Sequence, residues 1–438
     1  MQRAALVCLL LLTGCFQPNP VTGKSELSFY SDEEEVALGA QAAPGMEQES
    51  GGLYKDPELE AYVDAVGQRL AKSSDRPTIP FHYRILNTED ANAFALPGGF
   101  VYISRGLLAS LEDESQMAAC LGHETGHVAA RHGVHHLQYS QITSVLLNVG
   151  AQVAGRGSDE AAIAAGRGLK VAQTVTALAS LKYSRDDERQ ADHLGIDYAG
   201  RAGWDPRGMI GLMKVLQKGE KTQPNALQAM LRTHPLTTER VENAQAETSD
   251  LPPENLKGKT ISTPEFQRQV ARLREAEKAY QHHRKSKELA GQGKLQEAVQ
   301  EEDEAIRLAP RQAPFHAGRA ALKLRLNVPA EALSSAHQAE ALDPGLYEAA
   351  LVSGAASLQA GDTGSARASL TRASRLWPGH PAAPYYLGAL CEKEGRRDAA
   401  AECYAAALQA EGESGTYGRP AAEALRRLRP PTAPHRRR

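Results

Sequence analysis

The residues best suited to chemistry form the run His123-Glu124-Thr125-Gly126-His127. On a helix, His123 and His127 lie one turn apart on the same face, so both imidazoles can reach one metal ion. Glu124 lies beside them, where a carboxylate can accept a proton from a polarised water molecule. Apolar neighbours favour a buried helix for this run. The alternative is a helical histidine pair beside a solvated glutamate.

A third metal-binding group is predicted in an acidic segment in which Glu188 follows His127 by 61 residues. On a helix, Glu188 and Asp192 share a face. Glu188 can complete a set of two histidines and one glutamate, which leaves the fourth position open as catalytic zinc requires. Asp192 can accept a hydrogen bond from the Nδ1 of a ligand histidine and so fix its ring.

The elements that must position these groups are predicted to be mostly helices. Alternation of apolar residues, broken by a Pro-Gly-Gly turn, predicts a small set of strands ahead of the site helix. The expected strands are Phe81–Leu86, Asn92–Leu96 and Phe100–Ser104, and helices dominate Glu112–Gln217. Within the helical region, segment 142–180 has apolar runs broken by a glycine loop, and we expect a helical pair that covers the cleft.

The second of these strands is predicted to lie at the edge of the sheet beside the metal. It consists of Asn92, Ala93, Phe94, Ala95 and Leu96. Free backbone groups on an edge strand can bind a substrate by strand addition. The alternative is a hairpin with a purely structural role.

Four motifs in order now resemble one metallopeptidase family. They are NAFALPGGFVYISRGLL at 92–108, HETGHVAARH, YSRDDERQAD and Thr233-His234-Pro235-Leu236. The family includes the CAAX prenyl-protein proteases and the bacterial β-barrel assembly-enhancing proteases, and the likeness covers roughly 30–250. It implies one zinc ion per subunit bound by His123, His127 and Glu188, with Glu124 as general base and Asp192 beside the ligands. The absence of an internal apolar stretch of 18 residues sets the chain apart from multi-span members.

His234 is a further candidate, because the resemblance implies that its motif reaches the catalytic zone. A neutral imidazole there can fill the fourth metal position and keep the resting enzyme inactive. Alternatively, it can donate a hydrogen bond to the oxyanion that forms as water attacks the peptide carbonyl. A loop histidine beside a rigid proline is the third possibility. His132, His135 and His136 lie too many turns from the motif to bind the metal, so we expect structural or surface roles for them.

The C-terminal third has an internal repeat of 34 residues. Columns of proline, turn residues and alanine share this period, and a small residue recurs where paired helices would cross. The turn column is Gly293, Asn327, Gly361 and Gly395; the alanine columns are Ala298, Ala332, Ala366, Ala400 and Ala305, Ala339, Ala373, Ala407; the crossing column is Ser286, Ala320, Gly354 and Gly388. This resembles the tetratricopeptide repeat, which implies a solenoid whose concave face holds peptides.

The N-terminus resembles a bacterial lipoprotein signal. Arg3 precedes an apolar stretch, Ala4–Leu12, that suits a secretory signal and is too short to span a bilayer. Leu12-Thr13-Gly14-Cys15 resembles a lipobox, so we expect cleavage before Cys15 and acylation of its thiol. Phe16 is not the aspartate that marks inner-membrane retention in such signals, which favours the periplasmic face of the outer membrane.

Composition and charge set the remaining limits. A net charge of −3 gives no reason to expect nucleic acid as a partner, and low aromatic content with abundant alanine favours packed helices. Cys391 and Cys403 can pair with each other or remain free thiols. The predicted domains are a signal peptide at 1–14, a tether at 15–30, a zinc metallopeptidase domain at 31–250, a linker at 251–278, four repeats at 279–414 and a basic tail at 415–438.

The predicted fold is mostly α: a zincin-type α+β metallopeptidase domain with a small β-hairpin or sheet, followed by an α-solenoid of tetratricopeptide repeats. The predicted function is zinc-dependent endopeptidase activity in the bacterial envelope. The resemblance implies that the substrates are misfolded or assembly-stalled envelope proteins and that the repeats dock substrates or partners. Two alternatives are a chaperone or scaffold that rarely cleaves, and a peptidase for small peptides.

Overall fold

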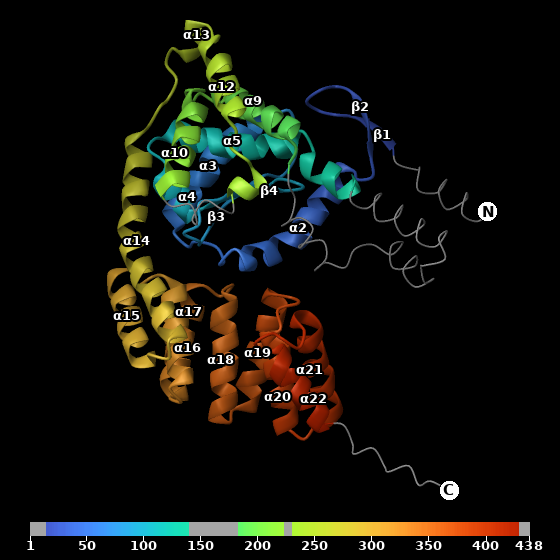
Figure 1. Ribbon diagram of the computed structural model, residues 1–438, viewed down its shortest axis with the longest axis vertical. Helices are drawn as coiled ribbons and strands as arrows, with labels where there is room; N and C mark the ends of the chain where they lie inside the picture. The colour runs from blue at the N-terminus through green and yellow to red at the C-terminus, as the bar shows by residue number, and fades with distance from the viewer. Residues whose placement is uncertain (1–14, 140–182, 223–229, 429–438) are drawn as a thin grey trace, which may run out of the picture. The chain divides into compact units, whose positions relative to one another are not determined.

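Figure 1 shows the computed structural model, which describes residues 15–139, 183–222 and 230–428. The chain divides into two compact units, the first ending at Leu273 and the second beginning at Arg274. Both are dominated by helices, and the mostly α fold class that the sequence predicts is confirmed. None of the helices in the described ranges has the length and apolar content that a membrane span needs. The predicted helical pair at 142–180 lies outside the described residues.

The sheet of the first unit has three strands in the order β3-β5-β4. They are β3 (His82–Leu86), β4 (Ala93–Leu96) and β5 (Phe100–Ser104). All five residues of the central strand β5 are buried, as its continuous apolar run requires. The hairpin from β4 to β5 turns through Gly98 and Gly99, whose φ angles of 77° and 97° favour glycine. β3 pairs with β5 in parallel and leaves β4 at an edge.

Helices surround this sheet. Besides two short ones, α4 (Arg105–Ser110) and α13 (Pro253–Leu256), they are α2 (Asp32–Glu49), α3 (Pro57–Ser73), α5 (Glu114–Ala129), α9 (Arg185–Arg201), α10 (Gly208–Thr222) and α12 (Thr238–Ser249). Asp113 caps α5 by accepting a hydrogen bond from the Gln116 backbone at 3.0 Å. All 16 residues of α5 are buried. A helix buried on every side is therefore the element that carries the His123–His127 motif.

The segment 15–30 is folded, whereas the sequence predicted a tether. It forms an antiparallel hairpin of β1 (Cys15–Pro18) and β2 (Ser25–Ser28). The turn is stabilised by Asn19, whose Oδ1 accepts hydrogen bonds from the backbones of Val21 and Thr22 at 2.9 and 3.1 Å. An asparagine that bonds to the backbone two residues on replaces part of a regular turn. That local chemistry explains the turn between the two strands.

The segment 251–278 also differs from the predicted linker. The Ile261 carbonyl accepts a hydrogen bond from the Ser115 backbone at 2.8 Å, and Thr260 pairs with Trp204 in a β-bridge. Phe266, in the long helix α14 (Pro264–Gly291), is fully buried. Val270 and Leu273 are buried as well, so the first three turns of α14 belong to the core of the first unit, and the division at Leu273 falls inside α14.

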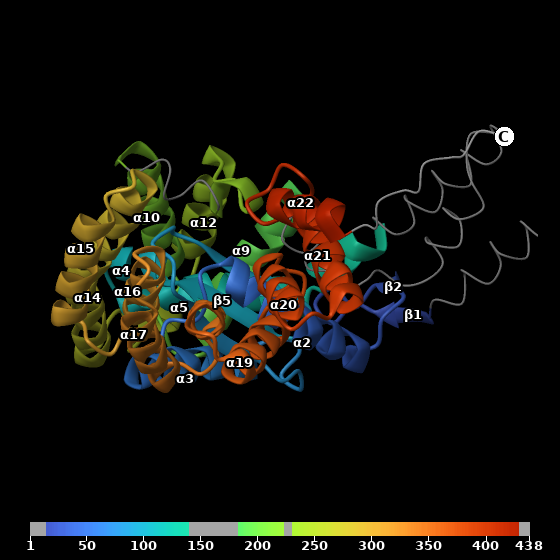
Figure 2. The ribbon, with the colours of Figure 1, turned by 90° about the horizontal axis from the view of Figure 1, so that it is seen from below.

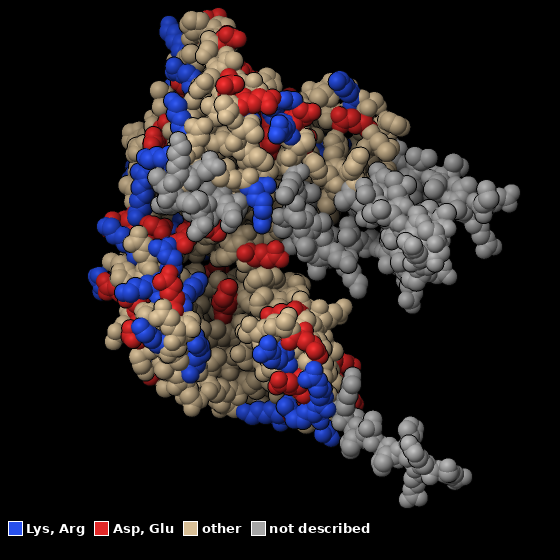
Figure 3. Space-filling view, in the orientation of Figure 1, with Lys and Arg blue, Asp and Glu red and all other residues tan. Residues whose placement is uncertain are grey.

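The second unit consists of successive antiparallel helices that lie side by side in chain order (Figures 1 and 2). After α14 they are α15 (Leu295–Leu308), α16 (Ala313–Arg325), α17 (Pro329–Leu342), α18 (Tyr347–Ala360), α19 (Thr363–Leu376), α20 (Ala382–Lys393), α21 (Arg397–Glu411) and α22 (Gly418–Leu428). On the face that Figure 3 shows, acidic and basic side chains are intermixed. α22 lies in the predicted basic tail and packs against α21 through Ala421 and Ala424.

The columns of the predicted repeat have clear structural reasons. All four turn residues adopt a left-handed backbone, with φ angles of 80° at Gly293, 63° at Asn327, 89° at Gly361 and 76° at Gly395. Glycine and asparagine tolerate that conformation best. A Cβ at Gly354 would lie 2.6 Å from Leu370 Cγ, and one at Gly388 would lie 2.8 Å from the Tyr404 ring. The crossing column is therefore small because paired helices approach closely there.

Three cysteines within the described ranges are free thiols. Cys120 and Cys391 are buried, and Cys403 is half-buried. Of the two alternatives for Cys391 and Cys403, the structure thus has the unpaired one.

Candidate metal centre

The site is built where α5 and α9 approach each other through glycines. A Cβ at Gly122 would lie 3.0 Å from the Gly195 carbonyl oxygen, and a Cβ at Gly195 would lie 2.9 Å from the His123 nitrogen. Larger residues would push the two helices apart. Ser184 caps α9 in a capping box with Asp187, so the acidic first turn, including Glu188, meets the positive end of the helix dipole. The glycine contact therefore brings Glu188 beside His123 and His127.

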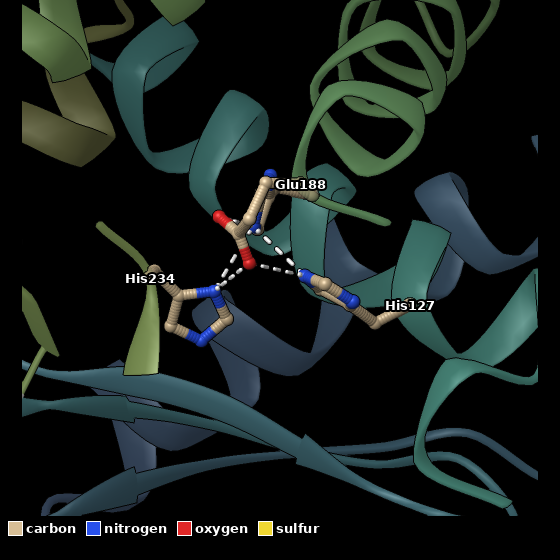
Figure 4. A group of neighbouring side chains, drawn as sticks. His127, Glu188 and His234 are labelled. Atoms are coloured by element: carbon tan, nitrogen blue, oxygen red, sulfur yellow. Dashed lines mark hydrogen bonds and ion pairs between the residues drawn. The ribbon is translucent and has the colours of Figure 1, made fainter. Parts of the chain in front are cut away.

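Four buried side chains direct their donor atoms at one point. They are His123, His127, Glu188 and His234, and one ligand atom from each lies within 4.8 Å of the others. Figure 4 shows His127, Glu188 and His234 converging from different elements. The Nε2 atoms of His123 and His127 are 3.1 Å apart, and His234 Nδ1 lies 3.4 Å from His123 Nε2. Glu188 Oε1 is 2.9 Å from His234 Nδ1 and 3.5 Å from His127 Nε2.

These distances suit a tetrahedral metal. Two nitrogens that are each bonded to zinc at about 2.0–2.1 Å lie about 3.3–3.4 Å apart in a tetrahedron. Five of the donor separations in the cluster range from 2.9 to 3.7 Å, and all the donor atoms lie within 4.8 Å of one another. A set of imidazole and carboxylate ligands is also one that zinc prefers. The donor chemistry and the spacing therefore both fit a bound metal ion.

Glu124 supplies a second sign of a ligand site. Its side chain is fully buried, and neither carboxylate oxygen has a hydrogen-bond partner within the described part of the chain. Burial raises the pKa of Glu124, and the charges of His234 and His123 offset this only in part. A buried carboxylate without partners costs several kcal/mol, so such groups occur mainly where a ligand or water binds.

His123 is held in place by a carboxylate and an arginine. Asp192, the residue predicted to orient a ligand histidine, has Oδ1 3.0 Å from His123 Nδ1. Arg240 of α12 binds both oxygens of Asp192 at 2.7 Å and contacts Glu188 Oε2 at 2.6 Å. The guanidinium thus neutralises two buried acids at once. Arg240 was not predicted, because no motif marks a single arginine 48 residues after Asp192.

His127 is supported by two residues whose roles the sequence did not reveal. Its Nδ1 lies 2.9 Å from His132 Nδ1, and His132 Nε2 lies 3.0 Å from Gln190 Oε1. The Tyr183 ring stacks on His127 with 3.9 Å between ring centroids. His132 was predicted to be structural, and it is buried in contact with a ligand. In the sequence, the position of His132 directly after Arg131, close to the end of the motif helix, was the one feature that could have indicated this role.

The electrostatics of the cluster keep the ligands in their metal-binding forms. Burial lowers the pKa of His127 well below its usual value, so its ring is neutral and offers a lone pair. Burial by itself would raise the pKa of Glu188, but the charge of His234 and hydrogen bonds from His127 and His234 hold it far below the usual value. Glu188 is therefore ionised.

The remaining predicted positions fall around this cluster. Ala95 and Leu96, at the end of β4, line a hollow together with His127, Arg131 and Tyr183. Asn92 precedes β4 and donates its backbone N–H to Ser104 Oγ at 2.9 Å. The rest of the predicted edge strand, Ala93 and Phe94, pairs with β5. His135 and His136 contact Glu26 and Asp187 away from the metal cluster, and Cys15 begins β1.

Together, the α5 histidines, the α9 glutamate and the small sheet define the class of metallopeptidase domains with an HExxH helix. Residues 57–248 match the model of Peptidase family M48, so this chain carries an M48 peptidase domain. The family relationship that the sequence predicts is confirmed.

Two relatives match about half of this chain. The beta-barrel assembly-enhancing protease of Escherichia coli is 29% identical over 237 residues, which cover 53% of this chain and 48% of that protein. The metalloprotease YcaL of Escherichia coli is 28% identical over 252 residues, covering 53% of this chain and 91% of the relative. The chain spans about half the length of the beta-barrel assembly-enhancing proteases that it matches.

Among solved structures, a thermophilic TPR protein from Thermus thermophilus resembles this chain with 18% identity. It covers 50% of this chain and 91% of that one, with a TM-score of 0.29.

Proposed function

We propose that this chain is a zinc-dependent endopeptidase that cleaves unfolded or assembly-stalled proteins in the bacterial envelope. The observation that carries the proposal is the fully buried, unpartnered Glu124 carboxylate beside a cluster of metal-binding donor atoms. An HExxH metallopeptidase needs this combination of ligands and base. The role in the envelope rests on the similarity to the beta-barrel assembly-enhancing proteases and on the lipoprotein-like N-terminus.

His123, His127 and Glu188 would hold one zinc ion per chain. When bound, that ion supplies Lewis-acid chemistry, which polarises water and a peptide carbonyl. Glu124 accepts the proton of the attacking water, because its carboxylate has no other partner in the described chain. Asp192 and His132 keep the Nδ1 atoms of the two ligand histidines engaged, so that both Nε2 atoms face the metal.

The ligand assignment is tested by metal content and cleavage together. We expect about one zinc per chain, loss of cleavage of an unfolded protein after chelation, and recovery when zinc is added back. Glu188→Ala should lose both zinc and cleavage, whereas Arg189→Ala on the exposed side of α9 should keep both. Full activity in the chelated protein would contradict the proposal.

His234 would act as an inhibitory fourth ligand. Its Nδ1 lies among the donor atoms, 3.4 Å from His123 Nε2, where a catalytic metal needs an open position. Its Nε2 lies 3.8 Å from Glu124 Oε1, so the ring also occupies the space beside the base. His234→Ala should then raise basal cleavage. If His234 instead stabilised the oxyanion, the same change would lower the rate by about 10²–10³.

Strand addition to the edge strand at 92–96 would place substrate beside the metal. The end of β4 shares a hollow with His127, and the edge of β4 away from β5 has no strand partner in the described sheet. Ala95→Pro removes one backbone donor from that strand and should raise KM more than it lowers kcat. Ala95→Gly is the matched control, because it changes the same side chain and keeps the backbone donor.

The repeats would dock substrates or protein partners, and acylated Cys15 would hold the chain on the periplasmic face of the outer membrane. A chain ending at Leu273 should retain zinc and recover native partners poorly, because the repeat surface is missing. Cys15→Ser should release the protein into the soluble fraction.

Cleavage of an unfolded protein but not of dipeptides would separate the endopeptidase from a small-peptide enzyme, and absence of both would indicate a scaffold.

A further inference from the structure

The N-terminal hairpin is bonded directly to the end of the catalytic helix. Arg131, two residues beyond α5, donates from Nη1 to Gln17 Oε1 at 2.6 Å and from Nη2 to the Tyr30 carbonyl at 2.5 Å. Asn19 Nδ2 lies 3.5 Å from the Ala130 carbonyl oxygen. Arg131 is buried and forms an ion pair with Glu35, so these contacts are anchored in the core.

A second group of contacts joins the hairpin to the helical segment 132–139. Gln138 Oε1 accepts a hydrogen bond from the Phe29 backbone, and Gln138 Nε2 lies 3.5 Å from the Leu27 carbonyl oxygen. His135 Nε2 lies 3.3 Å from Glu26 Oε2. Segment 132–139 is therefore joined to β2 and to the residue that follows it, whereas β1 is joined to Arg131. Removing a buried, charged partner such as Arg131 would be costly, which makes this a rigid connection.

Because of this connection, the anchor position and the catalytic unit are not separated by the flexible tether that the sequence predicted. Cys15 is the first residue of β1 and pairs with Ser28. A disordered tether of the same 16 residues would allow an end-to-end distance of about 20–24 Å. Cys15 instead lies in a hairpin that is hydrogen-bonded to the end of the catalytic helix.

The surface beside Cys15 suits a lipid headgroup region. Phe16 and Tyr139 are 72% and 76% exposed, although large aromatic side chains are usually buried. Lys24 and Glu26 are the sole charged residues of segment 15–30. Aromatic residues with few neighbouring charges are typical of proteins that rest at a membrane interface.

We propose that the β1–β2 hairpin and segment 132–139 form a membrane-contact face that fixes the catalytic unit directly on the lipid surface. The hollow beside His127 is lined by Arg131, Gly133 and Val134 of that same region. The site therefore takes polypeptide segments that lie at or emerge from the membrane in preference to segments free in solution. This inference rests on the proposed acylation and peptidase activity.

The proposed membrane-contact face is tested by measuring whether a tryptophan placed on it enters the lipid bilayer. Acylated Tyr139→Trp protein is bound to vesicles of phosphatidylethanolamine and phosphatidylglycerol that contain brominated acyl chains. We expect strong quenching of the new tryptophan, and none in the control Ile261→Trp. Ile261 is 53% exposed, and its carbonyl bonds to Ser115 in the first turn of α5, whereas the hairpin contacts Ala130 at the other end of that helix. The two native tryptophans are Trp204, which is buried, and Trp377, which is half-buried, and the unsubstituted protein provides their background.

The outcomes separate this proposal from the function on which it rests. Protein that sediments with vesicles while the tryptophan introduced by Tyr139→Trp stays unquenched would overturn the contact face and leave the anchor intact. Protein that does not sediment would overturn both. Peptidase activity on a soluble substrate is measured in parallel and is independent of either result.

The substrate preference is tested by lengthening the anchor. Insertion of 20 Gly/Ser residues between Cys15 and Phe16 allows an end-to-end distance of about 22–27 Å. We expect cleavage of a vesicle-bound unfolded protein to fall about threefold to tenfold, since effective concentration falls with tether length. Cleavage of the same protein in solution should not change. Equal rates on the vesicle-bound protein with and without the insertion would contradict the preference.

Discussion

The catalytic helix α5 and the repeat helices are both tightly packed, but they are stabilised in different ways. α5 buries His123, Glu124 and His127, whose partners come from far along the chain: His123 contacts His234, 111 residues away. In the repeats, the alanine columns are fully buried against the neighbouring helices, as at Ala332 and Ala366. Local periodicity is enough to build the second unit, whereas the first depends on long-range polar contacts.

This difference predicts where a single substitution does most damage. In the metal centre, removing one charge leaves another charge buried without a partner. The loss of unfolding free energy is therefore large, and zinc binding is weakened as well. In the repeats, a substitution lowers the unfolding free energy only through a side chain that does not fit its space, and we expect zinc binding in the first unit to stay unchanged. Three substitutions test this comparison.

Arg240→Ala should have the largest effect. It leaves Glu188 and Asp192 buried without their guanidinium partner, which costs about 3–5 kcal/mol of unfolding free energy. Urea unfolding of the metal-free protein measures this. Arg189→Ala is the matched control, because Arg189 pairs with Asp186 and Glu239 on the exposed side of α9. Equal stability of the two variants would show that the buried network contributes little.

Gly354→Leu should come next and affect the other unit. The new side chain would meet Leu370 Cγ, 2.6 Å from the position of a Cβ, and the Leu370 backbone nitrogen at 3.1 Å. Overpacking of this kind costs about 1–3 kcal/mol or more. Zinc affinity should not change, and Gly291→Ala, where a Cβ meets nothing within 4 Å, should be tolerated. A loss of zinc affinity in Gly354→Leu would contradict the separation of the units.

His132→Ala should have the smallest effect on stability and a specific effect on the metal. It removes the group that contacts His127 Nδ1 at 2.9 Å, and such changes typically weaken metal binding 10–100-fold. Competition with a fluorescent chelator gives the zinc dissociation constant. His193→Ala on α9, whose side chain is 62% exposed, should leave that constant unchanged. If both variants bind zinc like the wild type, His132 does not position the ligand.

The same comparison explains how much the sequence could predict. Period and residue type were sufficient to predict the repeats, because residues such as Gly361 and Asn327 are required by the left-handed backbone conformation at their own positions. The motif predicted that His123 and His127 share a face, because helical spacing fixes which side chains of one helix lie together. Glu188 lies on another helix and was joined to them by ligand chemistry and by the family resemblance. The strand Phe100–Ser104 was predicted with its observed bounds.

The remainder depends on contacts that no local pattern encodes. Arg240 and Tyr183 reach the site through tertiary packing, and no spacing rule links them to His123 or His127. The parallel pairing of β3 with β5 was likewise not evident from alternation alone. The polar segment 15–30 suggested a tether, because the side chains that order it include Arg131 and Gln138, more than 100 residues away.

The central claim is that Glu124 is the base of a metal-dependent peptidase. Zinc content and cleavage of an unfolded protein should be measured on the same preparation of wild type and Glu124→Gln. Glutamine keeps the shape of the side chain and cannot accept the proton, so we predict unchanged zinc with cleavage reduced by at least about 10²-fold. Wild-type cleavage by zinc-loaded Glu124→Gln would contradict the account.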